Sequence, residues 1–348
     1  MNIIEKIKEL KFKLGSRVLI PAHHYQSPEV VALADFVGDS YKLAVDCSNK
    51  KSEFIVFCGV KFMAEGAEIL AGPNQKILLP DLSAGCPLAD HIDGKQMEDV
   101  IKLIANTIKK DVTPVVYMNS TSEVKEICGR YNGSVCTSSN AKKIVEYYFK
   151  LGKSVFFAPD YNLGINTARE LGLAENAIIK VNKDISFTPK KLADSPKLFI
   201  WDGNCRVHKR FLMRDSEDFR KKYKTGKIIV HPECDEEIVN SADISGSTAK
   251  IYNEIKDSPI GSIWGVGTEY HFVERIAQEF PNKTIVPLKI SICMNMAKIK
   301  LNNLYDTLNN IDQFIEGKDE LKNQIKIDKN KKVNARKSLG KMIKITER

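Results

Sequence analysis

Short apolar runs that end in polar residues recur three times along the chain of 348 residues. They occupy residues 16–26, 113–120 and 226–234, and they end in the letters AHHYQ, YMNS and HPEC. Helical patterns separate the runs, so each run predicts a parallel strand of a βα unit. Because open α/β sheets bind ligands beyond the carboxyl ends of their strands, the polar ends predict a binding site.

Each run is followed by the same succession of segments. A serine-rich segment opens a helical pattern at residues 37–45, 135–148 and 244–255. Serine and threonine there are helix N-caps by default, but a helix N-terminus also offers free backbone N–H groups to an anion. Three equivalent caps beside three polar strand ends favour one shared anionic ligand. A second apolar run follows at residues 53–65, 154–164 and 262–273.

A third apolar run in each repeat leads to a cysteine. These cysteines are Cys86, Cys205 and Cys293. The spacing from the serine-rich segment to the cysteine is equal in the first and third repeats and longer in the second, which predicts an insertion in the second. The repeat therefore selects three of the eight cysteines.

The internal repeat predicts an α/β fold of three similar parallel-sheet units around a pseudo-threefold axis, with the active site at their junction. We expect these units at residues 1–80, 81–186 and 187–292. Residues 293–348 are expected to form a C-terminal helical segment and a lysine-rich tail. This arrangement would bring the three cysteines and the three polar strand ends together.

The composition is typical of a globular enzyme, with 43% hydrophobic and 28% charged residues. The N-terminal segment reads as an amphipathic helix without a signal-peptide pattern. No apolar run approaches the ~20 residues that span a bilayer. We therefore expect a cytoplasmic protein with no membrane partner.

The net charge of +9 raises the question of nucleic-acid binding. The lysines are spread along the chain, and the densest region, residues 317–348, has no aromatic residue for base stacking. We interpret this region as a solvated helix and tail, with nucleic-acid binding as the alternative. The charge is also compatible with small anionic substrates.

The length of the chain and the spacing of its cysteines limit the roles that these cysteines can have. A long chain without a secretory signal does not predict a disulfide framework, and the sequence has no C-x-x-C motif. Three converging cysteines can bind zinc together with a histidine, or a [4Fe–4S] cluster with one open iron. Spacing does not choose between the two.

The remaining five cysteines are interpreted as structural. Cys234 is a rival to Cys205 because HPEC looks like a ligand motif, but it sits beside the first strand of its repeat, where a ligand cysteine has no counterpart. Cys128 is expected in an inserted loop. Cys47, Cys58 and Cys136 have no counterparts in the other repeats.

Eleven motifs in order resemble the quinolinate synthase family. They are AHHYQ, GDSYKLA, FCGVKFMAE, LLPDLSAGCPLAD, YMNST, VCTSSNAKKIV, FFAPDYNLG, HPEC, SGSTAKIY, VGTE and ICMNMAKI. The resemblance runs from about residue 16 to residue 300, and the segments around Cys136 and Cys205 look like the longer variety of the family, which carries insertions. Each motif is weak, but eleven in one order are specific.

The resemblance implies a reaction and a cofactor. Iminoaspartate would condense with dihydroxyacetone phosphate to give quinolinate, phosphate and water, a transferase step of NAD biosynthesis. A [4Fe–4S] cluster would be held by Cys86, Cys205 and Cys293, with its open iron acting as a Lewis acid in dehydration. The partners would be these small molecules and a transient protein that delivers iminoaspartate.

The resemblance also implies a set of site residues. Those lining the substrate site would be His23, Ser40, Tyr117, Asn119, Ser138, His231, Glu233 and Thr248. Tyr25, His231 and Glu233 would be catalytic, with Tyr25 in proton transfer. Ser139 and Ser247 compete with Ser138 and Thr248 as the contacting hydroxyls.

The other histidines are given lesser roles. His24 is expected to pack or to support its neighbours. The resemblance assigns nothing to His91, His208 and His271.

Two other classes of function stay open. A non-catalytic iron–sulfur electron carrier or redox sensor would have a fourth protein ligand and would not need polar strand ends. A zinc hydrolase on the same three cysteines would bind zinc tightly and tolerate air.

Overall fold

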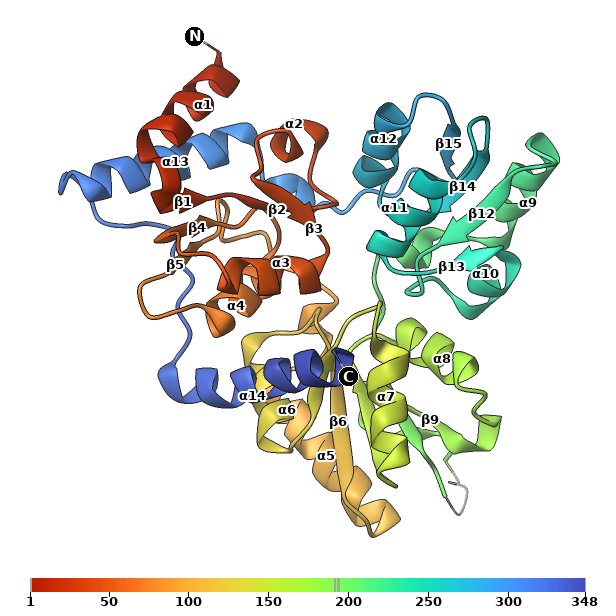
Figure 1. Cartoon of the computed structure of the whole chain (residues 1–348). Helices are drawn as coiled ribbons and strands as arrows, with labels where there is room; N and C mark the ends of the chain where they lie inside the picture. The colour runs from red at the N-terminus through yellow and green to blue at the C-terminus, as the bar shows by residue number, and fades with distance from the viewer. Residues whose placement is uncertain (1, 191, 193–194, 348) are drawn as a thin grey trace. The chain divides into compact units, whose positions relative to one another are not determined.

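The computed structural model describes residues 2–190, 192 and 195–347 (Figure 1). Strands and helices alternate along the chain, which confirms the α/β class. The chain forms two compact units, each made of several stretches. Unit 1 comprises Met1–Cys86, Glu269–Glu279 and Ile292–Ile327, and unit 2 comprises Pro87–Thr268, Phe280–Ser291 and Asp328–Arg348.

Unit 1 is built on short parallel strands: β1 (Val18–Leu19), β2 (Pro21–His23), β3 (Phe36–Gly38), β4 (Phe54–Val56) and β5 (Lys76–Leu78). The sheet order is β1-β4-β5, and β2 pairs with β3 in parallel. A parallel bridge between Ala22 and Cys58 joins β2 to the residues that follow β4. The helices are α1 (Ile3–Leu14), α2 (Pro28–Val31), α3 (Ser40–Ser48), α4 (Lys61–Leu70), α12 (Tyr270–Glu279) and α13 (Leu301–Ile315).

Unit 2 contains a six-stranded sheet of order β10-β9-β11-β8-β6-β7. Its strands are β6 (Val112–Tyr117), β7 (Ser134–Cys136), β8 (Ser154–Ala158), β9 (Ile178–Val181), β10 (Phe187–Thr188) and β11 (Leu198–Trp201). All neighbours are parallel except β10, which runs antiparallel to β9.

A second sheet of unit 2 has four parallel strands in the order β13-β12-β14-β15. They are β12 (Lys227–Val230), β13 (Ile244–Ser245), β14 (Ile263–Gly267) and β15 (Thr284–Pro287). The helices of unit 2 are α5 (Gly94–Ile108), α6 (Ser122–Arg130), α7 (Ala141–Lys150), α8 (Tyr161–Glu170), α9 (Met213–Lys222), α10 (Glu236–Ser241), α11 (Thr248–Asp257) and α14 (Lys329–Thr346).

The three sets of strands share one order. In each, the second strand lies beside the first, and the third and fourth follow on the other side: β3-β2 with β1-β4-β5, then β7-β6-β8-β11, then β13-β12-β14-β15. The sequence pattern predicts three strands per repeat and misses β3, β7 and β13, which have only two or three residues. The predicted insertion of the middle repeat contains β9 and β10. A pseudo-threefold placement of the sets stays a prediction.

The core of unit 2 explains why its strands read as uninterrupted apolar runs. Phe156, Phe199 and Trp201 have no exposed surface and belong to one cluster that also includes Val116. Helices cover both faces of a parallel sheet. Side chains that point to either face are therefore apolar, and the strand has no alternation of apolar and polar residues. Burial of each such side chain contributes roughly 1.5–3 kcal/mol.

Two expectations about local structure are wrong. The lysine-rich segment is not simply solvated, because α14 packs on α6, β7 and α7 and buries Ala335, Leu339 and Met342. Cys128 does not lie in an inserted loop but is buried in α6. In both segments, small or apolar residues that face the core are interspersed in the sequence with charged residues.

The predicted boundaries at residues 80, 186 and 292 stay predictions. Among the helices of the described residues, none combines the length and the apolar character that a membrane crossing requires.

Candidate functional site

The polar strand ends of the first and third repeats form the same turn. After β2, the backbone N–H of Tyr25 donates to His23 Nδ1 at 3.1 Å, and the ring of His23 meets that of Tyr25 edge-on at 4.7 Å. After β12, the N–H of Glu233 donates to His231 Nδ1 at 3.3 Å. In this turn the histidine accepts from the residue two positions ahead, so Tyr25 and Glu233 occupy equivalent places.

Glu233 is the centre of a buried polar network in unit 2. Its Oε2 lies 2.6 Å from His208 Nδ1, and its side chain is also hydrogen-bonded by Tyr117. His208 Nε2 lies 3.0 Å from Thr268 Oγ1, and the imidazole stacks on that of His231 with centroids 4.4 Å apart. His208, His231 and Glu233 are each at most 3% exposed. Polar groups that are buried this deeply are nearly always hydrogen-bonded, as these are.

The charge of Glu233 follows from this network. Burial raises the pKa of its carboxyl, but His208, His231 and the hydrogen bonds from His208 and Tyr117 outweigh burial and bring the pKa to about 2. Glu233 is therefore a carboxylate at neutral pH. Nearby, burial and the charge of Glu233 raise the pKa of Asp160 well above its usual range.

The turn that carries His231 and Glu233 is held from α8. Asn162 Nδ2 donates to the carbonyl of Glu233 at 3.1 Å, and Asn166 Nδ2 donates to the carbonyls of Pro232 and Cys234 at 2.9 and 3.0 Å. The two asparagines are four residues apart, so they lie on one face of the helix. The FFAPDYNLG motif thus contributes a support for the neighbouring strand end.

The eight cysteines divide by burial. Cys86, Cys205 and Cys293 are half-buried, and the other five are buried. Burial raises the pKa of Cys47 and Cys58 to about 12. It also places the pKa values of Cys128, Cys136 and Cys234 well above the usual range. Because the thiolate is the metal ligand, burial disfavours metal binding at these five.

The three half-buried cysteines share a local structure. Each lies three residues before a short 3₁₀ helix, at Ala89–His91, His208–Arg210 and Met296–Lys298. In the second and third repeats the cysteine carbonyl accepts the N–H four residues on, from Lys209 at 2.9 Å and Ala297 at 3.0 Å. The repeat of the sequence is therefore a repeat of local geometry at these cysteines.

Buried carboxyl groups hold two of the cysteine loops. Glu269 Oε1 accepts the backbone N–H of Cys293 at 3.1 Å. Asp160 is hydrogen-bonded by the backbone N–H of Cys205 and caps α8 by accepting from Leu163 at 2.7 Å. Both acids follow the third strand of their repeats and have no exposed surface.

The predicted hydroxyl residues lie at helix starts without being the caps. Ser40 and Thr248 are the first residues of α3 and α11, and the caps are Asp39 and Ser247, which accept from Lys42 at 2.9 Å and Lys250 at 3.3 Å. Ser138 lies in the turn before α7. There Ser139 Oγ is 2.8 Å from Thr137 Oγ1.

The loop that carries Asn119 is held by a buried lysine. Lys125 has no exposed surface, and its ammonium donates to the carbonyls of Met118, at 2.9 Å, and of Ser120. These carbonyls flank Asn119. Ser120 Oγ in turn donates to the carbonyl of Tyr117 at 2.8 Å.

The predicted site residues fall in both units. Unit 1 contains His23, Tyr25, Ser40, Cys86 and Cys293, and unit 2 contains Tyr117, Asn119, Ser138, Cys205, His231, Glu233 and Thr248. The structure brings Tyr117, His231 and Glu233 together in unit 2, with Cys205 close to Glu233. His24 behaves as a support: Arg275 donates to its Nδ1 at 3.0 Å, and burial lowers its pKa well below the usual value.

Several residues of this site escaped the sequence reasoning. His208, Asp160 and Glu269 contact the predicted residues Glu233, Cys205 and Cys293. Thr268 contacts His208, and Lys125 holds the carbonyls on either side of Asn119. One signal was available in the sequence: Cys205 and His208 have the C-x-x-H spacing of a ligand pair. The others are recognisable only after folding, because their partners are distant in sequence or are backbone groups.

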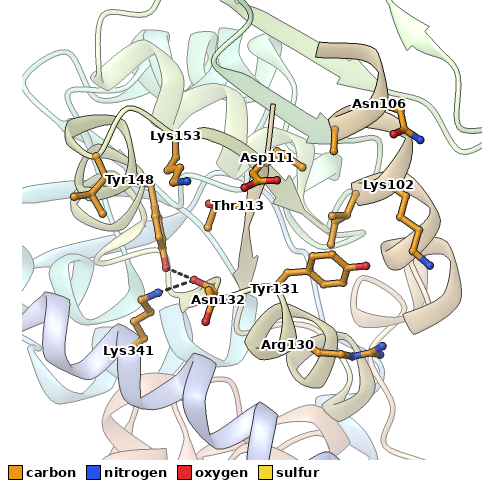
Figure 2. Close-up of a pocket in the computed structure, with 14 residues that line it drawn as sticks. Lys102, Asn106, Asp111, Thr113, Arg130, Tyr131, Asn132, Tyr148, Lys153 and Lys341 are labelled. Carbon is orange, nitrogen blue, oxygen red and sulfur yellow. Dashed lines mark hydrogen bonds between the residues drawn. The ribbon is translucent and has the colours of Figure 1, made fainter. Parts of the chain in front are cut away.

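A cavity of about 630 Å³ in unit 2 lies away from these residues (Figure 2). It opens beside Val112 and Thr113, at the amino end of β6, whereas Tyr117 is at the carboxyl end. Five residues of strand separate the two ends by roughly 17 Å. Lys341 and Tyr148 both donate to the carbonyl of Asn132 in its wall, at 2.6 and 3.2 Å. The cavity contains none of the predicted site residues.

Comparison with known proteins agrees with the resemblance seen in the sequence. The model of the family described as "Quinolinate synthetase A protein" matches residues 5–344. Proteins named quinolinate synthase are similar over most of their length. Those of Lysinibacillus sphaericus, Listeria monocytogenes and Bacillus subtilis are 40%, 41% and 39% identical, over 97%, 99% and 98% of this chain and 92%, 94% and 92% of theirs.

A solved structure, the E-1-hydroxy-2-methyl-but-2-enyl-4-diphosphate reductase from Plasmodium falciparum, aligns with 99% of this chain and 94% of its own at 12% identity and a TM-score of 0.26. That similarity is too low to carry an argument. The family match and the relatives, together with the repeated cysteine loops and polar strand ends, show that this chain belongs to the quinolinate synthetase A family.

Proposed function

We propose that this chain is an enzyme of NAD biosynthesis that condenses iminoaspartate with dihydroxyacetone phosphate to give quinolinate, phosphate and water. The observation that carries the proposal is the buried network of Glu233, His208 and Tyr117 beside Cys205. Family membership supports the same reaction. We also propose that the residues of units 1 and 2 join in one site, around the pseudo-threefold axis predicted from the repeat.

The residues present fit a [4Fe–4S] cluster. Cys86, Cys205 and Cys293 are half-buried thiols with equivalent local structure, and the N–H groups of the last two are fixed by buried acids. Three cysteines leave one iron of such a cluster without a protein ligand. When bound, the cluster would supply a Lewis acid for a substrate oxygen during dehydration.

Substrate binding is assigned to hydroxyl, amide and imidazole groups. Iminoaspartate carries two carboxylates, and its partner carries a phosphate. Ser40 and Thr248 stand at the positive ends of α3 and α11 and leave the capping of those helices to the residues before them. An anion at such a helix start gains from the helix dipole and the free N–H groups.

Proton transfer is assigned to Glu233, His231 and Tyr25. Glu233 is ionised at neutral pH, so it is available to accept a proton from a bound substrate, and its lowered pKa makes it a weaker base than a solvated carboxylate. His208 and Tyr117 orient its carboxylate. Tyr25, at the equivalent place in the first repeat, supplies a phenol that can donate or accept. A transient protein partner would deliver iminoaspartate before water destroys it.

The first experiment measures iron and acid-labile sulfide in protein purified without oxygen. We expect about four of each per chain, the stoichiometry of a cubane cluster. Cys86→Ser, Cys205→Ser and Cys293→Ser should each lose iron and quinolinate formation. Cys234→Ser is the matched control and should keep both, because its thiol is buried and protonated. Full iron in Cys205→Ser with loss in Cys234→Ser would overturn the ligand assignment.

A further inference from the structure

We propose that Cys205, His208 and Glu233 form a second, mononuclear metal site for Zn²⁺ inside unit 2. It differs from the proposed cluster site because it needs neither Cys86 nor Cys293. It would be filled when the cluster is not assembled. The inference does not depend on the reaction proposed above, since it concerns metal binding alone.

The three donor atoms already lie close together. Cys205 Sγ, a ring nitrogen of His208 and a carboxylate oxygen of Glu233 are all within 4.8 Å of one another. Tetrahedral zinc bonds of about 2.0–2.3 Å place ligand atoms roughly 3.3–3.7 Å apart. His208 Nδ1 and Glu233 Oε2, now 2.6 Å apart, would separate by about 1 Å to admit the ion. Side-chain rotation is enough for such a change.

The donor set suits zinc in kind and in charge. Thiolate, imidazole and carboxylate are the ligands that zinc takes in proteins, whereas Mg²⁺ and Ca²⁺ take oxygen donors. One thiolate and one carboxylate balance the two positive charges of the ion. That balance matters here because His208 and Glu233 are at most 2% exposed, and an unbalanced charge is costly in such surroundings.

The imidazole of His208 is oriented as a metal ligand is. Its Nε2 is fixed by Thr268 Oγ1 at 3.0 Å, and its ring is stacked on His231. The other nitrogen, Nδ1, therefore faces Glu233. Metal-ligating histidines have their second nitrogen held in this way, and loss of the holding group weakens binding.

The local sequence makes the site particular to one repeat. Cys205 and His208 are the ends of a C-x-x-H motif, and the turn between them is closed by the bond from Lys209 N–H to the Cys205 carbonyl. The positions that correspond to His208 are Ala89, which has no donor atom, and Met296, whose thioether is not among the usual zinc ligands. The other two cysteine loops therefore lack this pair of ligands.

Zinc and the cluster would exclude each other because both use Cys205. Zinc in this site would block cluster assembly, and its fourth position would be open to water. Protein that has lost its cluster would then contain about one zinc per chain, held by unit 2.

The test uses full-length protein from which the cluster has been removed, titrated with Co²⁺ as a spectroscopic substitute for Zn²⁺ and then with Zn²⁺ itself. We expect one Co²⁺ per chain with a thiolate-to-cobalt charge-transfer band, which Zn²⁺ abolishes. X-ray absorption of the zinc form should show one sulfur neighbour and the remainder nitrogen or oxygen. Three sulfur neighbours would overturn the proposal.

Variants separate the two metal sites. The double variant Cys86→Ser/Cys293→Ser should keep one zinc per chain and lose the cluster. His208→Gln should lose zinc and still assemble iron and sulfide. Thr268→Val, which leaves every ligand in place, should weaken zinc binding by roughly 10–100-fold.

The matched control is His271→Gln. His271 also contacts a buried glutamate, Glu269, at 3.1 Å, but it lies in unit 1 and should not affect zinc. Zinc retained by His208→Gln, or lost from the double cysteine variant with its circular dichroism unchanged, would contradict the proposed site. Quinolinate formation by the reconstituted wild type is scored separately, so failure of the zinc site and failure of the proposed function give different results.

Discussion

Glu233 keeps its negative charge in a place that excludes water. Burial alone would favour the protonated acid, and the charge persists because two imidazoles and a phenol surround the carboxyl group. The folded protein itself, through His208, His231 and Tyr117, offsets the cost of burying this charge, and no substrate is needed for that. Such preorganisation is what allows a buried carboxylate to act on a developing charge.

A first prediction concerns acid stability. The pKa of Glu233 is lowered on folding from 4.5 to about 2, so its stabilising contribution is complete above pH 4.5 and is lost as the pH falls toward 2. Glu233→Gln should remove this loss and flatten the pH dependence of the free energy of unfolding in that window. Urea unfolding at several pH values measures the effect.

Asp160→Asn is the contrasting control for this prediction. Burial raises the pKa of Asp160 above its ordinary 3.8, so its ionisation in the unfolded chain lowers stability as the pH rises past that value. Asparagine should remove that decline because its amide does not ionise. It can still cap α8, so the helix keeps its N-terminal hydrogen bond. Two variants with parallel pH profiles would contradict the opposite signs assigned to the two acids.

A second prediction at the scale of residues concerns Lys125. Lys125→Met leaves the carbonyls of Met118 and Ser120 without this donor, at a cost of about 1–3 kcal/mol for each buried group. The loop around Asn119 should then lose its fixed geometry. We expect KM for the substrates to rise about tenfold or more, with iron and sulfide unchanged.

Steady-state kinetics with separate KM and kcat values tests the role of Lys125. Lys142→Met, on the exposed face of α7, is the control and should leave both values unchanged. If Lys125→Met lowers iron content and kcat together while KM stays constant, the lysine does not act through the loop of Asn119.

At the scale of elements, α14 is a brace for the helices that follow the site loops. Ser338 Oγ donates to the carbonyl of Lys125 in α6 at 2.9 Å. At its other end, the hydroxyl of Thr346 accepts from Asn140, the N-cap residue of α7, at 3.1 Å. One helix thus contacts the elements that follow both the Asn119 loop and the Ser138 turn.

The close approach of α14 and α6 gives a prediction at this scale. A Cβ on Gly129 would lie 1.9 Å from the carbonyl oxygen of Asn334, so Gly129→Ala must push the two helices apart. We expect a loss of about 1–3 kcal/mol in the free energy of unfolding. Gly340→Ala, also in a helix but with no atom within 4 Å of the added Cβ, should gain roughly 0.5–1 kcal/mol.

Thermal or chemical unfolding of the two alanine variants measures this difference. Both substitutions raise helix propensity equally, so the contrast isolates the contact between α6 and α14. Equal stabilities would mean that the two helices slide past each other without cost, and the bracing role of α14 would have to be abandoned.

At the scale of the whole molecule, the chain consists of three repeats. They share a strand order, but different side chains hold their cysteine loops and strand ends in place. The apolar runs predict the buried strands because parallel strands are covered on both faces. The three cysteines are predicted because each follows the third apolar run of its repeat, whereas β3, β7 and β13 are not predicted because two or three residues carry no period. The packing of α14 was missed because Ala335, Leu339 and Met342 stand among lysines.

The site is predictable only to the extent that it repeats. His231 and Glu233 follow a strand end, as His23 and Tyr25 do, so their place was visible in sequence. Thr268 and Asp160 owe their roles to contacts with residues more than forty positions away, His208 and Cys205. Such partners are set by tertiary packing and leave no local period in the sequence.

The interleaved order of the two units governs when each can fold during synthesis. Unit 1 begins at the N-terminus, yet α1 packs against α13, where Lys13 pairs with Asp312 and Glu316. Unit 2 is completed only by α14. At translation rates of roughly 5–20 residues per second, the earliest strands wait many seconds for their last partners. Neither unit can therefore be completed before its last stretch has been synthesised, Ile292–Ile327 for unit 1 and Asp328–Arg348 for unit 2.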